Sequence, residues 1–592
     1  MPRITEDPNL TPYGVELTKR FVVPGAEDEL YRRYVTDVEN HFVTFIDYMG
    51  GDGMIERVAT AGHGVSIFAE HPEQMDFFRH LIAKSIFTPF KSVIFRLHVQ
   101  SSIADALHMV YHPQSSVNEY SGRYSVMIDT AFTPSVEYLA SRAQSVVHTD
   151  DRKLAEQIRE LIRSHRATNY ERYTALISDD IDLARELART PLELNNDTAF
   201  FWKIDLYSLV RFVQEKRGLI GNTTNSLHPY LDRFESIART TAPLAAAALF
   251  SNQGKDLTLS QPNSDSIIDP TPLPAGWCPQ LTKRLVVPEA EATLFTPQPY
   301  LDHGAIQLTD YMGGDLTPAE TARISYGAGT QRVSQDRHLI RYLLRHRHTT
   351  PFEHPEFSVE GKVPVFVDPR QAGRHRTLDS HCFMGKTLVG SDYFLPDKSE
   401  LKFQNRLNRQ GRGESLPESL RRRVLGSLEE SYRAQLELVS RLRELGVDED
   451  IVQGAKGVGF YTFQYRTGDL HNWLHFLGLR LDAHAQEEIR AYAQICATLL
   501  ERLFPTTHEG FQDYFVKGVT FTQQELEVLS GLVGSALKDF DFDDPNAYPR
   551  TFSMPARRED EASTKQRAFN RVGDELRSKL RYLLELRKGN QD

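Results

Sequence analysis

A duplication of a whole domain constrains the fold of this 592-residue chain more than any other feature. The octapeptide LTKRFVVP at Leu17 recurs as LTKRLVVP at Leu281, and DYMGGD at Asp47 recurs at Asp310. The repeat distances are 264 and 263 residues, which is the length of a domain and far longer than a solenoid repeat. The sequence therefore predicts two tandem copies of one domain.

Composition places the boundaries between the parts. The stretch from Ser251 to Pro279 is rich in Ser, Asn, Asp and Pro, which is typical of a linker. A charged amphipathic helix is predicted from Ser563 to Lys588, beyond the second copy. We therefore expect a first domain at residues 1–250, a linker at 251–279, a second domain at 280–537 and a C-terminal extension at 538–592.

The charge and the cysteine content exclude several classes of protein. The net charge of -11 gives no general attraction to nucleic acid or to an anionic membrane, so an anionic ligand would need a local arginine cluster. Three cysteines are too few for a disulfide framework or a zinc site, and we expect no metal. No apolar run reaches membrane-spanning length, and the first residues do not resemble a signal peptide. A cytoplasmic protein is expected.

Each copy mixes strands with long helices. β-branched and aromatic residues recur at strand spacing from Ser92 to Val99 and from Phe357 to Val367. Helical patterns run from Leu416 to Leu445 and from Ala483 to Leu503. We expect the α+β class, with a small sheet and several long helices in each copy.

Two polar clusters, one in each copy, are candidates for phosphate binding. In the first copy, Ser121-Gly122-Arg123 follows Glu119, and a turn of small residues can direct backbone N–H groups at an anion. In the second copy, Arg374-His375-Arg376 offers guanidinium groups that can bind phosphate oxygens in pairs. Taken alone, the first cluster also fits an ordinary polar loop and the second a solvated run of charges.

Read together, the two clusters resemble the signature of the flavin-dependent thymidylate synthases, R-H-R-x-x-S-x-N-E-x-S-x-R-Y, with T-P-F-E-H and R-Q-x-x before it. The first copy keeps the later half of that signature, and the second keeps the earlier half. The matching positions of the first copy are Ser116, Asn118, Glu119, Ser121, Arg123 and Tyr124. Those of the second copy are Thr350 to His354, Arg370, Gln371, Arg374, His375 and Arg376, whereas Met384 and Lys386 replace the Ser and the second Arg.

A second family motif is divided in the same way. The second copy reads LRLDAHAQEEIR from Leu479, close to the family's L-R-x-D-x-x-A-Q-x-E-I-R, and the first copy has Lys216 at the place of Arg480. The first copy keeps the family's phosphate-binding arginine as Arg189, where the second copy has Gln453.

In this family the nucleotide site is shared between subunits, and the resemblance therefore implies one composite site across an internal pseudo-dimer. The first copy would give the loop from Glu119 to Arg123 and Arg189; the second would give Gln371, Arg374 and Arg480. The reciprocal combination would need residues that do not match the family: His108, Tyr111, Lys216, Met384, Lys386 and Gln453. Decay of a pseudoenzyme is the alternative, although random decay would not sort the losses in this way.

The resemblance implies reductive methylation of dUMP to dTMP, with methylenetetrahydrofolate as carbon donor, FAD as hydride carrier and NADPH as reductant. Arg480 would stabilise charge on the uracil ring; its structural alternative is a helix-start arginine paired with Asp482. The implied dUMP-binding residues are Glu119, Tyr120, Ser121, Gly122, Arg123, Arg189, Gln371, Arg374 and Arg480. The implied FAD-binding residues are Glu119, Ser325, His348, Thr350, Arg374, His375, Arg376, Asp469, His471 and His475.

Two other functions stay open at this point. The chain could methylate or hydroxymethylate another pyrimidine nucleotide at C5, or it could bind a nucleotide without catalysis. Because the family works as a homotetramer, a homodimer of the fused chain is the expected assembly, with dUMP as ligand and neither nucleic acid nor a membrane as partner.

Overall fold

The computed structural model describes residues 34–35, 41–63, 73–123, 125–137, 139–140, 152–220, 227–251, 285–326, 336–367, 379–382, 392–404 and 412–537. The chain forms two compact units, Met1–Val516 and Lys517–Asp592. Both copies of the repeat lie in the first unit, and the second contains α20 (Gln523–Leu537). Most of the predicted linker and all of residues 538–592, including the predicted helix from Ser563 to Lys588, lie outside the described residues.

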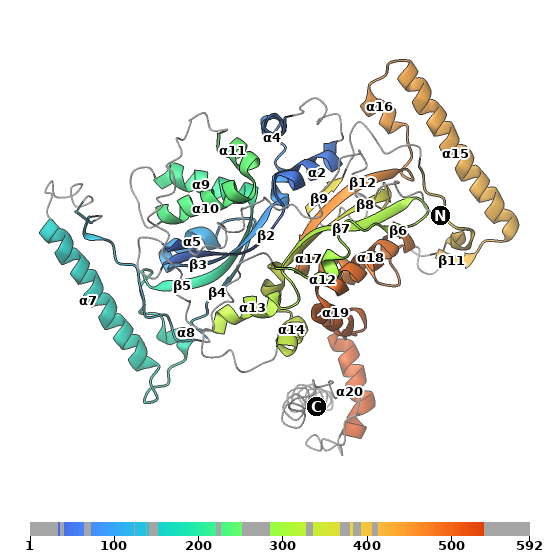
Figure 1. Cartoon of the computed structure of the whole chain (residues 1–592). Helices are drawn as coiled ribbons and strands as arrows, with labels where there is room; N and C mark the ends of the chain where they lie inside the picture. Colours follow the sequence, from blue (N-terminus) through green and yellow to red (C-terminus); the bar gives the residue numbers. More distant parts are fainter. Residues whose placement is uncertain are drawn as a thin grey trace. The chain divides into compact units, whose positions relative to one another are not determined.

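Each copy contains a five-stranded antiparallel sheet, and the two sheets have the same strand order (Figure 1). In the first copy the order is β1 (Tyr34–Val35), β2 (Phe42–Met49), β3 (Ile94–Ser102), β5 (Asp197–Asp205) and β4 (Ser115–Glu119). In the second copy it is β6 (Gln298–Tyr300), β7 (Gly304–Met312), β8 (Glu356–Pro364), β12 (Tyr461–Asp469) and β9 (Asp379–Cys382). A two-stranded sheet joins β10 (Lys402–Gln404) to β11 (Arg412–Ser415). The α+β class and the duplication are thus confirmed.

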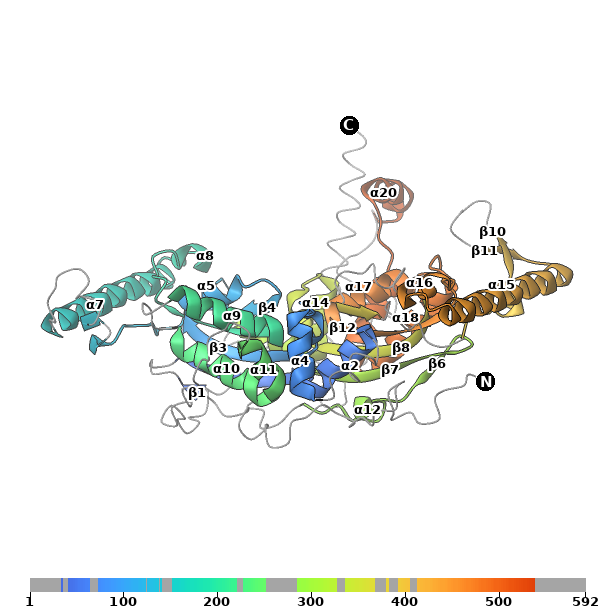
Figure 2. The same ribbon diagram turned by 90° about the horizontal axis from the view of Figure 1, so that it is seen from above.

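Helices complete each copy. The helices of the first copy are α2 (Asp52–His63), α4 (Gln74–Ala83), η1 (Thr88–Ser92), α5 (Ile103–Val110), α7 (Arg152–Leu176), α8 (Arg185–Ala188), α9 (Leu206–Ile220), α10 (His228–Thr241) and α11 (Pro243–Ser251). Those of the second copy, up to Val516, are α12 (Pro288–Glu291), α13 (Thr317–Arg323), η3 (Ile324–Tyr326), α14 (Asp336–Arg345), η4 (Thr350–Glu353), η6 (Lys398–Glu400), α15 (Glu418–Glu444), α16 (Glu449–Gly454), α17 (Leu470–Arg480), α18 (Glu487–Leu503), α19 (Pro505–Phe511) and η7 (Gln512–Val516). Figure 2 shows the long helices α7 and α15 extending away from the two sheets.

The predicted elements exist with bounds that differ by one to four residues: β3 begins two residues later and ends three later than predicted, and β8 ends three residues earlier. The strand predicted from Ser92 is β3, the strand predicted from Phe357 is β8, and the helix predicted from Leu416 is α15. The helix predicted from Ala483 begins four residues later, as α18. The carboxylate of Asp482 accepts a hydrogen bond from the backbone N–H of His484 at 2.7 Å, and this local turn competes with helix formation.

The two copies share their cores through α2. Ile55 and Ala59 on one side of this helix belong to the core of the first copy, whereas Met54 and Val58 belong to the core of the second. The hydroxyl of Tyr465 in β12 lies 2.8 Å from the sulfur of Met54. Each copy therefore buries apolar surface against the other, and neither core is complete on its own.

A reciprocal pair of hydrogen bonds marks the pseudo-two-fold relation between the copies. The backbone N–H of Gly50 donates to Asp310 at 2.9 Å, and that of Gly313 donates to Asp47 at 2.8 Å. Both glycines have a positive φ, +80° and +79°, and a Cβ at Gly50 would lie 2.6 Å from a backbone oxygen. The repeated G-G-D motif thus serves the contact between the copies, because other residues would strain this turn.

No helix in the described parts of the chain is long and apolar enough to span a membrane.

Candidate active site

The loop that follows β4 in the first copy docks on the second copy. Ser325 of η3 is the centre of this contact: its hydroxyl donates to the carbonyl of Glu119 at 2.9 Å, and its carbonyl accepts from the backbone N–H of Ser121 at 3.3 Å. The hydroxyl of Ser125 donates to the same carbonyl at 3.4 Å. The side-chain amide of Asn118 donates to the carbonyl of Thr321 at 2.6 Å. The nucleotide loop predicted from the first copy is therefore held in place by residues of the second.

The buried position 122 of this loop requires a glycine. A Cβ on the buried Gly122 would lie 2.4 Å from the sulfur of Met127 and 3.1 Å from the Cδ of Arg189. The close approach brings the start of the Arg189 side chain against the loop, while the Arg189 and Arg123 side chains themselves are exposed. Exposed guanidinium groups, one on the loop and one at the end of α8 (Arg185–Ala188), are suited to an anionic ligand.

Glu119 ends β4 with a partly buried carboxylate. Burial raises its pKa, and the hydrogen bond from Thr198 together with the positive charge of Arg189 opposes the rise. The Thr198 hydroxyl donates to this carboxylate at 2.7 Å. The neighbouring Tyr120 is buried, and its backbone N–H donates to Ala199 at 2.8 Å. The loop therefore begins from a fixed point on the sheet.

Acidic residues of η4 and β12 in the second copy contact two residues of the first copy, Ser116 and Lys203. Burial raises the pKa of Glu353, and the Asp469 charge raises it further; Lys203, a hydrogen bond from Ser116 and His471 lower it. Lys203 of β5 lies 3.5 Å from Asp469. Because Ser116 belongs to β4 and Glu353 to η4, the strand that carries the nucleotide loop also contacts the T-P-F-E-H element.

Asp469 caps α17 as well. Its carboxylate accepts hydrogen bonds from the backbone and side-chain N–H groups of Asn472, at 2.8 and 2.9 Å. Burial raises its pKa, and the charge of Lys203 together with the backbone hydrogen bond lowers it. This satisfies two N–H donors at the helix start and fixes α17 relative to β12.

Arg480 is the last residue of α17, at the opposite end from Asp469. Eleven residues of helix separate the two ends by about 16 Å. The alternative of a helix-start arginine is wrong in this respect, because Arg480 ends a helix. The carboxylate of Asp482 accepts hydrogen bonds from both the backbone and the ring of His484.

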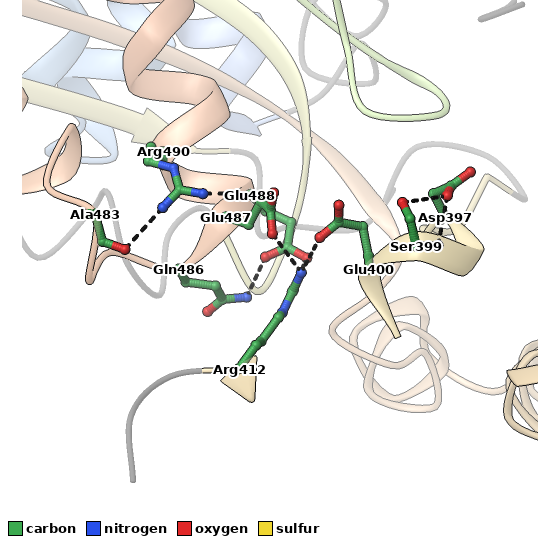
Figure 3. Close-up of polar contacts among 9 residues, drawn as sticks. All are labelled: Asp397, Ser399, Glu400, Arg412, Ala483, Gln486, Glu487, Glu488 and Arg490. Carbon is green, nitrogen blue, oxygen red and sulfur yellow. Dashed lines mark hydrogen bonds and ion pairs between the residues drawn. The ribbon is translucent and has the colours of Figure 1, made fainter. Parts of the chain in front are cut away.

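The segment after Arg480 is pinned by a polar network (Figure 3). Arg490 of α18 donates to the carbonyl of Ala483 at 3.0 Å, and Gln486 donates to Glu488 at 2.8 Å. Arg412 of β11 binds Glu488 and also donates to Glu400 at 2.7 Å. The conspicuous charges of the A-Q-x-E-I-R stretch thus have a positioning role: they hold the turn that follows Arg480.

The comparisons with known proteins agree with the duplication. The family model described as thymidylate synthase complementing protein matches twice, at residues 44–218 and 307–506. The chain belongs to this family. It is 38% identical over 255 residues to the flavin-dependent thymidylate synthase of Ehrlichia ruminantium (strain Gardel), which covers 43% of this chain and 86% of that protein. It is also 38% identical over 266 residues to that of Rickettsia prowazekii (strain Madrid E), covering 43% and 90%.

Among solved structures, a UMP/dUMP methylase from Streptomyces cacaoi crystallised with 5-Br UMP is 29% identical. The match covers 37% of this chain and 98% of that one, with a TM-score of 0.34.

Several predicted site residues of this family member cannot be placed. Gln371, Arg374, His375 and Arg376 lie outside the described residues, as do Met384 and Lys386 of the reciprocal combination. His348 is exposed, with its ring 6.0 Å from that of Tyr342, and His475 is exposed on α17.

The described residues of the reciprocal combination differ from those of the family motif. Glu119 pairs with Phe200, and Cys382 pairs with Gln464 at the equivalent place of the second sheet. Cys382 therefore stands where the first copy has Glu119. Tyr111 is 79% exposed, and Lys216 lies 3.2 Å from Glu215 on the same helix. This loss of a carboxylate could have been found from the sequence, by counting back from Met384.

Sequence reasoning assigned no role to Lys203 or Glu353, although each contacts a residue of the other copy, Glu356 and Ser116 respectively. Glu353 was within the quoted T-P-F-E-H motif, which was a usable signal. Lys203 lies in a strand of aromatic and aliphatic residues and belongs to no motif, so no signal in the sequence marked it.

The described residues fit a flavin by the chemistry of their donors. The hydroxyl groups of Ser325 and Thr350 belong to η3 and η4, which both contact β4, and His348 lies two residues before Thr350. Hydroxyl and imidazole groups are suitable partners for the phosphates and polar ring edge of such a cofactor. Among the residues that we describe, Ser325, Thr350 and His348 would hold it.

Proposed function

We propose that this chain is a flavin-dependent thymidylate synthase with one composite active site, which converts dUMP to dTMP. The observation that carries the proposal is the docking of the Glu119–Arg123 loop of the first copy on Ser325 of the second. This loop is the part of the family signature that only the first copy keeps, and Ser325 belongs to the copy that keeps the rest.

Binding of the nucleotide phosphate falls to groups from both copies. Arg123 and Arg189 of the first copy would pair with phosphate oxygens. Gln371 and Arg374 of the second copy would complete the phosphate site. Because the chain as a whole is acidic, this local concentration of guanidinium groups is what selects an anion.

Arg480 would lie against the uracil ring and stabilise the negative charge that develops there during methyl transfer. A preorganised donor of this kind lowers the activation barrier by about 3–4 kcal/mol. FAD would supply the hydride, with NADPH as its reductant and methylenetetrahydrofolate as the source of the carbon unit. The assembly that we propose is a homodimer of the fused chain, with domains at residues 1–250 and 280–537 joined by the linker at 251–279.

Mirror variants test this function inside one chain. Arg123→Ala removes a residue of the proposed site, and Lys386→Ala removes the residue at the equivalent position of the other copy. Conversion of dUMP to dTMP is measured with FAD, methylenetetrahydrofolate and NADPH present. Its rate should fall more than about 100-fold in the first variant and stay unchanged in the second. Equal loss in both variants would contradict a single composite site, and no dTMP from the unaltered chain would contradict the function itself.

A further inference from the structure

Among the described residues, the ion pairs that connect the two copies run in one direction. Three cations of the first copy contact four carboxylates of the second: Arg57 with Glu360, Arg96 with Glu320 at 3.7 Å, and Lys203 with Glu356 at 2.7 Å and with Asp469 at 3.5 Å. All of these side chains are buried except that of Glu320, which is 29% exposed. A pseudo-symmetric interface would be expected to carry each contact twice, once in each sense. This one carries positive charge on one side and negative charge on the other.

Helices α2 and α13 occupy the same place in the two copies, and an aspartate with the same backbone contacts sets the alignment of their residues. Asp52 accepts hydrogen bonds from the backbone of Leu244 and Ala245, and Asp315 accepts from that of Thr506 and Thr507. Arg57 lies five residues after Asp52, and Glu320 lies five residues after Asp315. The two residues with opposite charges thus occupy one position of the repeat.

The strand register gives the remaining equivalences. Both sheets have a bulge at the same place, after which Asp47 pairs with Arg96 and Asp310 pairs with Ser358. The positions that correspond across the copies are Arg96 with Ser358, His98 with Glu360, Ile94 with Glu356, Lys203 with Thr467, and Asp205 with Asp469. Each cation of the first copy thus corresponds to a neutral or acidic residue of the second.

These equivalences show what a pairing of like copies would bring together. Two first copies would place Arg57 against Arg96, at the position where Glu320 now lies. Lys203 would face Ile94 in place of Glu356, and Asp205 in place of Asp469. Two second copies would place Glu320 against Glu360 and leave the second-copy carboxylates opposite Thr467. Like charges at a buried interface are strongly disfavoured, whereas the unlike pairing gives each of these three cations a carboxylate partner.

We propose that this charge arrangement restricts the first copy to pairing with a second copy, so that composite interfaces form and like-with-like interfaces do not. The restriction matters for a fused duplicate, because two chains could otherwise exchange copies and form two symmetric pairs. Each symmetric pair would lack half of the residues that the composite site needs. The inference depends only on the interface and holds whatever reaction the chain catalyses.

A disulfide reporter at the pseudo-two-fold axis can detect which copies pair. Met49 and Met312 pack against each other with Ile94 in a buried cluster. In the full chain, Met49→Cys alone can form a disulfide between the two positions 49 only if two first copies pair. In the double variant Met49→Cys with Met312→Cys, a disulfide between positions 49 and 312 forms only if unlike copies pair, whereas one between two positions 49 or two positions 312 reports like pairing. Oxidation with copper phenanthroline, followed by peptide mass mapping, separates the two products. We expect the mixed disulfide in the double variant and at most a trace in the single one.

The charge itself is tested by Arg57→Glu in the Met49→Cys background. The new carboxylate can face Arg96 of another first copy, as Glu320 does in the native pairing, so the like-pair disulfide should increase by about tenfold or more. Adding Glu360→Arg supplies the new carboxylate with a cation in the unlike pairing and should reverse the increase. The milder Arg57→Gln should give a smaller increase in the same direction, with circular dichroism reporting that each variant is folded.

Two results would overturn the proposal. One is a like-pair disulfide in Met49→Cys alone at a yield comparable with that of the double variant. The other is a yield that Arg57→Glu and Arg57→Gln both leave unchanged in folded protein.

Discussion

Replacing Lys203 with methionine should destabilise the chain more than any single surface change. Its ammonium group is buried, lies 2.7 Å from Glu356 and 3.5 Å from Asp469, and is the cation that both of these carboxylates contact. Burial lowers the pKa of Lys203, but the charges of Glu356 and Asp469 and the hydrogen bond to Glu356 outweigh it and raise the pKa, so the side chain is charged throughout the normal pH range. Lys203→Met keeps much of the apolar stem but leaves two buried carboxylates without this cation.

Removing one partner of a buried ion pair costs about 3–5 kcal/mol. The unit that contains Lys203 runs from Met1 to Val516. At an unfolding entropy of about 2.1 cal/mol/K per residue, that loss corresponds to a decrease of about 3–5 °C in its melting temperature. Differential scanning calorimetry at pH 7.5 measures it directly. Adding Glu356→Gln removes one of the stranded charges and should recover about 1–2 kcal/mol.

Arg79→Met is the control at an exposed ion pair. The side chain of Arg79 on α4 is 61% exposed and pairs with the exposed carboxylate of Asp76 at 3.4 Å. A pair of this kind contributes less than about 1 kcal/mol, so its removal should lower the melting temperature by at most about 1 °C. A decrease for Lys203→Met no larger than that for Arg79→Met would refute the idea that the buried ion pairs hold the copies together.

Three further predictions concern single side chains. Burial raises the pKa of Glu56 to about 7, so the folded chain keeps a proton that the unfolded chain loses above pH 4.5. The free energy of unfolding should therefore fall as the pH rises from 4.5 to 7. Glu56→Gln should be more stable than the native chain by at most about 3 kcal/mol at pH 8, and no more stable at pH 4. Ser325→Ala removes the 2.9 Å bond to Glu119 and should weaken dUMP binding, measured by calorimetry, by about 1 kcal/mol or fivefold. Arg480→Lys should lower kcat by about 100-fold or more, since lysine lacks the planar fork of guanidinium.

Each of these predictions has a control in the same chain. Glu73→Gln changes an exposed carboxylate near Glu56 and should leave the pH profile of stability unaltered. Ser178→Ala removes a hydroxyl bonded at 2.7 Å within an exposed turn and should leave dUMP binding unaltered. Lys216→Arg changes the first-copy equivalent of Arg480 and should not alter kcat. Matching effects in a variant and its control would show that the named contact is not the cause.

The parts of the fold that depend on local pattern could be read from the sequence. The alternation of β-branched and aromatic residues located β3 and β8, and the duplication predicted two sheets of the same kind. The start of α18 was missed by four residues because the side chain of Asp482 forms a local turn, and a periodic pattern does not contain that competition.

The site could be predicted in part because the two copies differ. Comparison of the halves separated the Glu119–Arg123 loop from the residues of the second copy, and the structure shows that this loop docks on Ser325 of the second copy. Lys203, Glu356 and Asp469 were not predicted as a group. They lie far apart in the sequence and acquire their environment only when the copies pack, so no spacing rule connects them.

The number of dUMP molecules bound by each chain tests the central claim most directly. Isothermal titration calorimetry of the flavin-loaded chain with dUMP, with the chain concentration fixed by amino-acid analysis, gives this number. One composite site predicts a stoichiometry of one dUMP per chain, abolished by Arg123→Ala and kept in Lys386→Ala. Two dUMP molecules per chain, or one that survives Arg123→Ala, would contradict it.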